Sequence, residues 1–490
     1  MNGNPRGSAP RREPRTLKGA VVSGLLWKTF ENFGAQFVNF GVSVVLARLL
    51  APEDFGTIAL LTIFISVASL LMEGGFPTAL VQKADADQLD RCSVFYFNIG
   101  VGLLLYGVLW LSAPAVASFY RIPELAPIMR VLSLRVVLGS LSAIQQVELA
   151  RGMLFRRSFA IALPSVLVKA AAGVALALSG FGLWSLVWSE LAGGAVAAAM
   201  NWIVIGWRPS PAFSLSRLRS MLPFGTRLMG ANFATIVAAQ LHALVIGRVY
   251  SAADLGFYNR GDHLPQIAMS AVGGSVEAVL FPAFSKLQDD RPKLKRALRR
   301  TIRTTTFLIF PLLFGIASAA EPLVRFLLSE KWMPSVPFVR LACLIYAFTP
   351  VGSANLQAVK AIGQGGALLK IQVAKRALAI LAVLATYRFG VLCMAFGRLA
   401  IAPFELMLNV RPNARYLGYT FGELMRDVLP NMGLALFMAL CSYGASALVP
   451  LPDPATLALQ AGVGASVYLG LGLLFRMEGM SELRNVAGRR

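Results

Sequence analysis

Residues 93–113 have the sequence SVFYFNIGVGLLLYGVLWLSA, in which no side chain is charged. A stretch of about 20 apolar residues is the length that an α-helix needs to cross a hydrocarbon core about 30 Å thick. Similar stretches follow one another along almost the whole chain, and no polar segment between them is long enough to form a separate soluble domain. The sequence therefore predicts a polytopic α-helical membrane protein.

The composition agrees with this interpretation. Of the 490 residues, 56% are hydrophobic and 14% are charged, whereas a soluble domain is roughly 45–50% apolar and about 25% charged. The formal net charge of +22 would indicate a nucleic-acid partner in a soluble protein. Here the basic residues gather in alternate loops, which is typical of a membrane protein. We therefore predict no nucleic-acid partner.

The apolar stretches predict an all-α membrane protein with about fourteen transmembrane helices. Their expected positions are 21–47, 56–80, 93–113, 125–148, 159–179, 182–205, 221–247, 256–283, 305–320, 335–359, 368–386, 389–409, 427–448 and 455–475. The basic segment ahead of them, residues 1–20, is rich in proline and glycine and is expected to be a disordered cytoplasmic tail.

Lysine and arginine are enriched in the cytoplasmic loops of membrane proteins. They gather in the N-terminal tail and in alternate loops after it, including residues 286–303 and 360–376. An even number of spans, with both termini in the cytoplasm, accounts for this asymmetry. Residues 286–303 are then expected to form a basic connector near anionic lipid headgroups, and residues 477–490 a second cytoplasmic tail.

The sequence also contains a repeat. Val45, Arg48, Asp54 and Gly56 recur 200 positions later as Val245, Arg248, Asp254 and Gly256. Both copies begin on the cytoplasmic side, so the repeat is parallel rather than inverted. Two similar bundles that face each other form a central site in several transporter folds. We therefore expect an N-terminal bundle over 21–220, a C-terminal bundle over 221–410, two additional helices over 411–476, and a cavity between the two bundles.

The first span is unusually polar. Lys28, Asn32, Gln36 and Asn39 are spaced so that they share one face of a helix, and Glu31 stands three residues after Lys28. A charge at the bilayer centre costs at least about 2.5–3.5 kcal/mol, so such residues usually face a protein interior or a watery cavity. Two interpretations remain open: an internal ion pair with interhelical hydrogen bonds, or one wall of a solvated cavity.

Further polar residues lie in later spans, and Arg398 and Glu405 are two more charges within an expected span. Arginine and lysine are natural partners of phosphate, so embedded cations suit an acidic substrate. The candidates for substrate binding are Lys28, Asn32, Gln36, Asn39, Lys169, Arg227, Asn232 and Gln240. The candidates for coupling to a proton or sodium ion are Glu31, Asp262 and His263, with a packing role as the alternative for His263.

Enzyme motifs are isolated or incomplete. Asp85-Ala86-Asp87 matches the D-x-D of some metal-dependent glycosyltransferases, but no catalytic domain adjoins it. Gly363-Gln364-Gly365-Gly366 lacks the Lys-Ser/Thr pair of a P-loop. The four cysteines lie far apart and only two histidines occur, so no metal-binding spacing is present. We predict no enzyme activity, no catalytic residue, no metal and no cofactor.

Several segments together carry a family likeness. They are LWKTFENFGAQFVNFGVSVVLARLLAPEDFGTIAL, GGFPTALVQ, LGFYNRGDHLP, FPAFSKLQDD and SEKWMPSVPFVRLACLIYA. In this order they resemble Wzx-type flippases of lipopolysaccharide and exopolysaccharide biosynthesis, within the multidrug/oligosaccharidyl-lipid/polysaccharide exporter superfamily. The likeness covers residues 20–410, and the last two expected spans match by hydropathy alone.

The resemblance implies two bundles in a V shape around a central cationic cavity, in a bacterial inner membrane. It implies a polyprenyl-pyrophosphate-linked oligosaccharide as the substrate, moved to the outer leaflet by alternating access. Membrane lipids are then expected partners, and a polysaccharide polymerase with its export machinery is a further candidate. The alternatives are a multidrug/cation antiporter, which would favour an embedded acid with aromatic residues, and a membrane glycan polymerase or ligase, which would carry a large outer loop.

Overall fold

The computed structural model describes residues 34, 36–83, 85–475, 477, 479 and 480. Every regular element in this part of the chain is a helix, so the predicted all-α class is confirmed. The N-terminal half contains a helix over Gln36–Leu49, α2 (Pro52–Glu73), α3 (Phe76–Gln82), α4 (Gln88–Tyr120), α5 (Leu125–Leu132), α6 (Leu134–Arg151), α7 (Phe155–Leu178) and α8 (Leu183–Val204).

The C-terminal half begins with two long helices, α9 (Leu215–Val249) and α10 (Ala252–Ser285). They are followed by α11 (Arg291–Ser318), α12 (Ala320–Leu328), the 3-10 helix η1 (Glu330–Ser335), α13 (Val336–Ala347), α14 (Thr349–Ala361), α15 (Gly365–Thr386), α16 (Val391–Leu417), α17 (Phe421–Leu448) and α18 (Asp453–Leu474).

Ten helical segments of the described chain are long and apolar enough to cross a membrane, so this is a multi-pass membrane protein. The expected spans at 221–247, 256–283 and 368–386 coincide with α9, α10 and α15, which are helical but stand outside those ten. Each carries charged side chains along its length. The total of about fourteen spans and the cytoplasmic location of both termini stay predictions.

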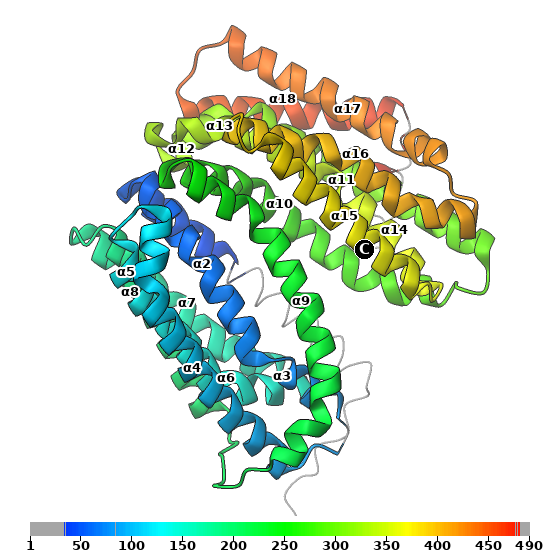
Figure 1. Ribbon diagram of the computed structural model, residues 1–490. Coiled ribbons are helices and arrows are strands. Elements are labelled where there is room, and N and C mark those ends of the chain that lie inside the picture. Colours follow the sequence, from blue (N-terminus) through cyan, green and yellow to red (C-terminus); the bar gives the residue numbers. More distant parts are fainter. Residues whose placement is uncertain (1–33, 35, 84, 476, 478, 481–490) are drawn as a thin grey trace, which may run out of the picture.

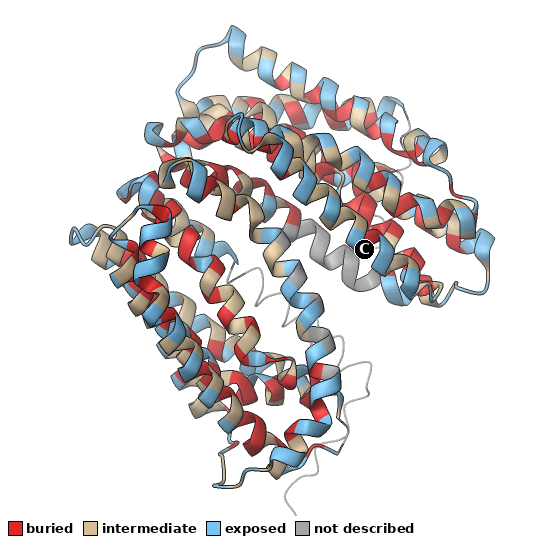
Figure 2. Cartoon of the chain, in the orientation of Figure 1, coloured by how far each residue is buried: buried red, intermediate tan, exposed pale blue. Residues whose placement is uncertain are grey.

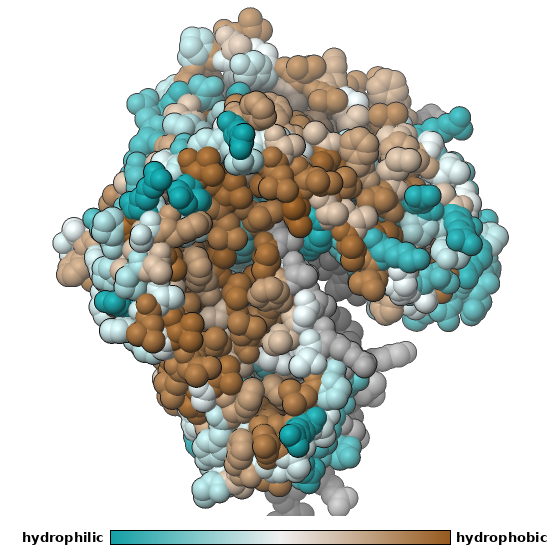
Figure 3. All heavy atoms as spheres, in the orientation of Figure 1, coloured by the Kyte–Doolittle hydropathy of each residue, from teal (hydrophilic) through white to brown (hydrophobic). Residues whose placement is uncertain are grey.

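The outer faces of the helices are apolar. Figure 2 shows buried residues concentrated where helices face one another and exposed residues on the outside. Many of the exposed side chains are large hydrophobic ones, such as Leu111 (73% exposed), Ile203 (72%) and Leu440 (68%). In Figure 3 a continuous hydrophobic surface covers the near face of the molecule, with hydrophilic residues toward its edges. This distribution fits a protein whose outer faces contact the hydrocarbon core of a membrane.

The helices form two lobes that meet at one end and diverge toward the other (Figure 1). Helices α2–α8 form the first lobe and α10–α18 the second, while α9 contacts helices of both lobes. The main contact between the lobes is the packing of α2 against α10.

The two copies of the sequence repeat meet in this contact. A Cβ atom placed on Gly56 would lie 1.7 Å from the carbonyl oxygen of Ala252, and one placed on Gly256 would lie 2.1 Å from that of Pro52. Both distances exclude any side chain larger than glycine's hydrogen. Since Ala252 and Gly256 stand 200 positions after Pro52 and Gly56, the contact is reciprocal, as at a twofold axis.

Hydrogen bonds reinforce the end where the lobes meet. The Arg48 side chain donates to the carbonyl oxygens of Phe326 and Leu327, the latter at 2.9 Å. Lys331 Nζ donates to Leu50 O at 2.6 Å, and Trp332 Nε1 donates to Ala47 O at 2.8 Å. The helix over Gln36–Leu49 is therefore fixed to the second lobe at its C-terminal end.

Helix α17 is joined to α11 by ion pairs to one buried carboxylate. Asp427, whose side chain is fully buried, accepts hydrogen bonds from Arg299 (2.8 Å), Arg303 (2.6 Å) and Tyr419 (3.0 Å). Residues 286–303 were expected to be a basic connector, but helix α11 begins at Arg291. Part of the expected connector is helical because Arg299 and Arg303 stand one helical turn apart, and in a helix both face the carboxylate of Asp427 on α17.

Candidate substrate cavity

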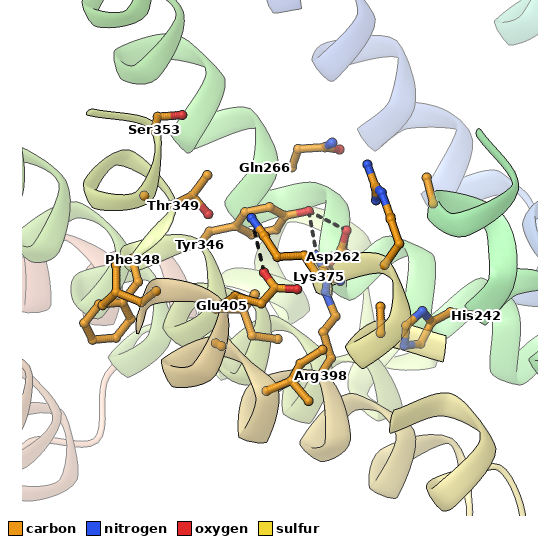
Figure 4. A pocket seen from close by; sticks show the side chains of 18 of the residues that line it. His242, Asp262, Gln266, Tyr346, Phe348, Thr349, Ser353, Lys375, Arg398 and Glu405 are labelled. Carbon is orange, nitrogen blue, oxygen red and sulfur yellow. Dashed lines mark hydrogen bonds and ion pairs between the residues drawn. The ribbon is translucent and has the colours of Figure 1, made fainter. Parts of the chain in front are cut away.

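The second lobe contains a polar cavity of about 550 Å³. Helices α9, α10 and α13–α16 line it, and their side chains converge on it as Figure 4 shows. Its polar and charged lining residues are Gln240, His242, Tyr258, Asn259, Asp262, Gln266, Tyr346, Thr349, Ser353, Lys375, Arg376, Arg398, Glu405 and Asn409. A polar cavity of this size within an apolar lobe is typical of a ligand site.

One ion pair in the cavity is tightly held. Arg398 and Asp262 approach to 2.6 Å, and Tyr346 Oη donates to the other carboxylate oxygen of Asp262 at 2.8 Å. Arg398 also donates to Tyr258 Oη at 3.3 Å. Both oxygens of Asp262 are therefore occupied (Figure 4). This network joins α10, α13 and α16 and is suited to fixing the cavity wall.

A second ion pair is looser. Lys375 Nζ lies 3.6 Å from Glu405 Oε2, beyond ideal hydrogen-bond distance. Within the described part of the chain, Glu405 has no other ion-pair or hydrogen-bond partner, and Arg376, the next residue of α15, has none at all. Among the described residues that line the cavity, three cations, Lys375, Arg376 and Arg398, thus face two carboxylates, which leaves an excess of positive charge.

Two polar atoms on the cavity wall lack partners among the described residues. They are Asn409 Oδ1, on a side chain that is 4% exposed, and His242 Nε2. The imidazole of His242 stacks on Tyr258 with ring centres 6.1 Å apart. Because buried polar groups are normally hydrogen-bonded, these atoms are suited to contact a bound polar molecule or water.

The first lobe holds a smaller charged cluster in which Glu190 accepts from both Lys169 (2.5 Å) and Arg135 (3.0 Å). Glu190 stands eight residues after Gly182, the N-cap of α8, and Arg398 stands eight residues after Gly390, the N-cap of α16. Helices α8 and α16 therefore carry charges of opposite sign at the same distance from their N-caps.

The structure brings only part of the predicted site together. Gln240 and Asp262 line the cavity. His263 is exposed and is not among the lining residues, Gln36, Asn39 and Asn232 are exposed, and Lys169 is paired with Glu190. Lys28, Glu31 and Asn32 lie outside the described residues, as does the side chain of Arg227. The assignment of these residues to substrate or ion therefore stays a prediction.

Sequence reasoning missed Lys375, Arg376 and Asn409 as site residues. The two cations lie within the expected span 368–386 but were counted with the basic segment 360–376 as evidence of topology, whereas α15 (Gly365–Thr386) carries both into the lobe. A signal was nevertheless present, because Arg398 and Glu405 are spaced by two helical turns and so share one face of a charged membrane helix. Asn409 extends that face by one further turn.

The sequence is similar to proteins of polysaccharide biosynthesis. The model of the polysaccharide biosynthesis protein family matches residues 45–337. The succinoglycan biosynthesis transport protein ExoT of Rhizobium meliloti is 29% identical over 348 residues, which are 71% of this chain and 70% of that protein. The lipopolysaccharide biosynthesis protein WzxC of Escherichia coli is 25% identical over 69% of each chain.

The fold is similar to those of solved transporters. A lipid II flippase, MurJ, in an inward closed conformation aligns with a TM-score of 0.74 over 92% of this chain and 99% of its own, at 15% identity. An inward-facing multidrug resistance transporter of the MATE family aligns with a TM-score of 0.59 over 79% and 96%. These identities show a common fold, and the sequence match over more than half of the chain shows that this protein belongs to the polysaccharide biosynthesis protein family.

Proposed function

We propose that this protein is a flippase that moves a polyprenyl-pyrophosphate-linked oligosaccharide across a bacterial inner membrane for lipopolysaccharide or exopolysaccharide synthesis. The observation that carries the proposal is the positively charged, polar cavity within an apolar two-lobed membrane protein. The names of the relatives support it, because they are transport and biosynthesis proteins of succinoglycan and lipopolysaccharide.

The cavity supplies groups for each part of such a headgroup. The guanidinium of Arg376, which no carboxylate of the described residues neutralises, suits a pyrophosphate oxygen, because arginine binds phosphate through paired hydrogen bonds. The amides of Gln240, Gln266 and Asn409 suit sugar hydroxyls, since an amide both donates and accepts. The isoprenoid chain stays in the lipid, and only the headgroup crosses.

The two lobes give a physical route for the crossing. They are in close contact at the end that contains Gly56 and Gly256 and diverge at the other end. In our proposal the two lobes move relative to each other about this contact, so that the headgroup site faces one side of the membrane and then the other. The excess of positive charge in the cavity disfavours the alternative of an antiporter for lipophilic cations.

We further propose that transport is coupled to a proton through Glu405. Asp262, one of the residues predicted for this role, has both oxygens occupied. Glu405, in contrast, has only the 3.6 Å ion pair with Lys375 among the residues that the structure describes. A pyrophosphate that binds Lys375 displaces Glu405 from it, and Glu405 then takes up a proton because an isolated carboxylate in the membrane is costly. Substrate binding and proton uptake thereby become linked.

The proposed function is tested by reconstituting the full chain in liposomes with a fluorescent polyprenyl-pyrophosphate-linked oligosaccharide. A quencher added outside the liposomes reaches only the fluorescent lipid of the outer leaflet, and so measures how much labelled lipid has moved between leaflets. We expect movement well above that of protein-free liposomes. If the labelled lipid does not move between leaflets but a lipophilic cation such as ethidium is transported in the same liposomes, the result would contradict the proposal and favour the antiporter.

A further inference from the structure

The outer side of the second lobe has an apolar groove of about 530 Å³ that is separate from the substrate cavity. It lies between α15, α16 and the first residue of α17, and its lining residues are Leu378, Phe404, Met407, Leu408, Val410, Arg411, Ala414 and Phe421. All of them are uncharged apart from Arg411. Phe404 and Met407 are 61% and 57% exposed, so the groove opens to the surroundings of the lobe.

Arg411 is a cation without a partner. In the part of the chain that the structure describes, its guanidinium has no ion pair or hydrogen bond, and it is exposed. Arg415, one turn further along α16, stacks on the ring of Tyr416 with 5.8 Å between guanidinium and ring centre and does not line the groove. The positive charge of Arg411 is therefore available to a ligand that occupies the groove.

The position of Arg411 along α16 suits a lipid headgroup. Helix α16 is long and apolar enough to cross a membrane and ends at Leu417, so Arg411 lies about 9 Å from that end. The apolar residues Phe404, Met407 and Leu408 lie further from the end, toward the centre of the helix. The groove thus places a positive charge at headgroup height and apolar side chains at the height of acyl chains.

The groove and the substrate cavity are lined by different faces of the same two helices. On α15, Lys375 and Ala379 line the cavity, while Leu378 lines the groove. On α16, Glu405 and Asn409 line the cavity, while Phe404 and Arg411 line the groove. Because α15 packs against α16, these two helices stand between the groove and the cavity.

From this arrangement we infer that the groove binds an anionic phospholipid of the surrounding membrane, with its phosphate on Arg411 and an acyl chain along Phe404, Met407 and Leu408. A basic pocket between membrane helices is a known kind of site for acidic lipid headgroups. The bound lipid packs against the outer faces of α15 and α16, whose inner faces carry Lys375, Arg376 and Glu405. The inference rests on the groove and is independent of the proposed transport activity.

Native mass spectrometry of the purified full chain tests the inference. The protein is mixed with phosphatidylglycerol and phosphatidylcholine of identical acyl chains, and the lipids that remain bound are counted. We expect the wild type to retain phosphatidylglycerol in preference, and Arg411→Gln to retain about tenfold less of it, as for the loss of one charged hydrogen bond. Arg415→Gln is the matched control and should retain the wild-type amount.

Three results would overturn the inference. Equal retention by Arg411→Gln and wild type would show that the groove does not bind the phosphate. Equal losses in Arg411→Gln and Arg415→Gln would show attraction to general surface charge. Displacement of phosphatidylglycerol by undecaprenyl phosphate at lower concentration, in the wild type but not in Arg411→Gln, would identify an isoprenoid lipid as the occupant instead.

Ala414→Trp, which fills the groove and keeps the charge, should also lower retention.

Discussion

At the scale of single residues, Arg376 is the cavity cation that neither a carboxylate nor a hydrogen bond occupies within the described chain. Replacing it with glutamine should weaken binding of farnesyl pyrophosphate at least about tenfold, because a hydrogen bond to a charged group contributes roughly 1.5–3 kcal/mol. Isothermal titration calorimetry measures this. Lys370→Gln, an exposed cation of the same helix outside the cavity, is the control, and an equal loss there would contradict the assignment.

The Lys375–Glu405 pair leads to a second prediction at this scale. If pyrophosphate displaces Glu405 from Lys375, binding should be accompanied by uptake of up to about one proton. Calorimetry in two buffers with different ionisation enthalpies counts that proton. His242, Tyr258, Asp262, Tyr346, Lys375, Arg376 and Arg398 are the other titratable or charged groups that line the cavity.

Glu405→Gln separates Glu405 from these other groups. The variant should bind farnesyl pyrophosphate at least as tightly as the wild type, because the competitor for Lys375 is neutral, and it should take up no proton. Proton uptake that persists in Glu405→Gln would assign the proton to another group of the cavity or to the pyrophosphate itself, and not to Glu405. Binding without proton uptake in the wild type would exclude the coupling while leaving the flippase proposal intact.

At the scale of elements, one buried carboxylate makes several of the contacts that attach α17 to α11. Asp427 receives hydrogen bonds from Arg299 and Arg303 of α11 and from Tyr419. Asp427→Asn removes the carboxylate that Arg299 and Arg303 share, and breaking a buried pair costs about 3–5 kcal/mol. Because the arginines are about one third exposed, we expect roughly 2–3 kcal/mol, measured as a lower temperature of thermal unfolding in detergent.

The start of α11 provides the comparison. Asp290 is partly exposed and caps this helix by accepting from Lys293 N at 3.0 Å, and the hydrogen bond from the Lys293 side chain lowers the pKa of Asp290. Asp290→Asn retains a capping side chain, since asparagine caps as well as aspartate, and should unfold at nearly the wild-type temperature. If both variants unfold at the same temperature, the buried network is not what holds α17.

Local sequence patterns predicted the helices but not the contacts between distant ones. Apolar length predicted the helices because a membrane requires every backbone group to be paired within a helix. It did not predict α11 as the continuation of a basic segment, since the stabilising carboxylate of Asp427 is 124 positions from Arg303. Likewise Lys375 and Arg376 became cavity residues only because α15 packs against α16. Partners distant in the chain are not visible in local patterns.

At the scale of the whole molecule, the repeat in the sequence became a reciprocal contact between the lobes. Gly56 and Gly256 each approach a carbonyl oxygen of the opposite copy, which leaves no space for a methyl group. Either Gly56→Ala or Gly256→Ala should therefore push the lobes apart at this end. Because the contact is reciprocal, the two variants should change the distance between the lobes in the same direction and by similar amounts.

Pulsed electron resonance can measure that distance between spin labels on Glu124 and Glu330, two exposed residues at the end where the lobes meet. The labels require a chain in which the four cysteines are replaced. Both glycine variants should shift the population to longer distances, while Gly107→Ala, whose added Cβ meets nothing within 4 Å, should not. An unchanged distribution in both variants would mean that the helices adjust locally, and the contact would then not control how the lobes open. A shift in only one variant would show that the two copies of the repeat do not contribute equally to the distance between the lobes.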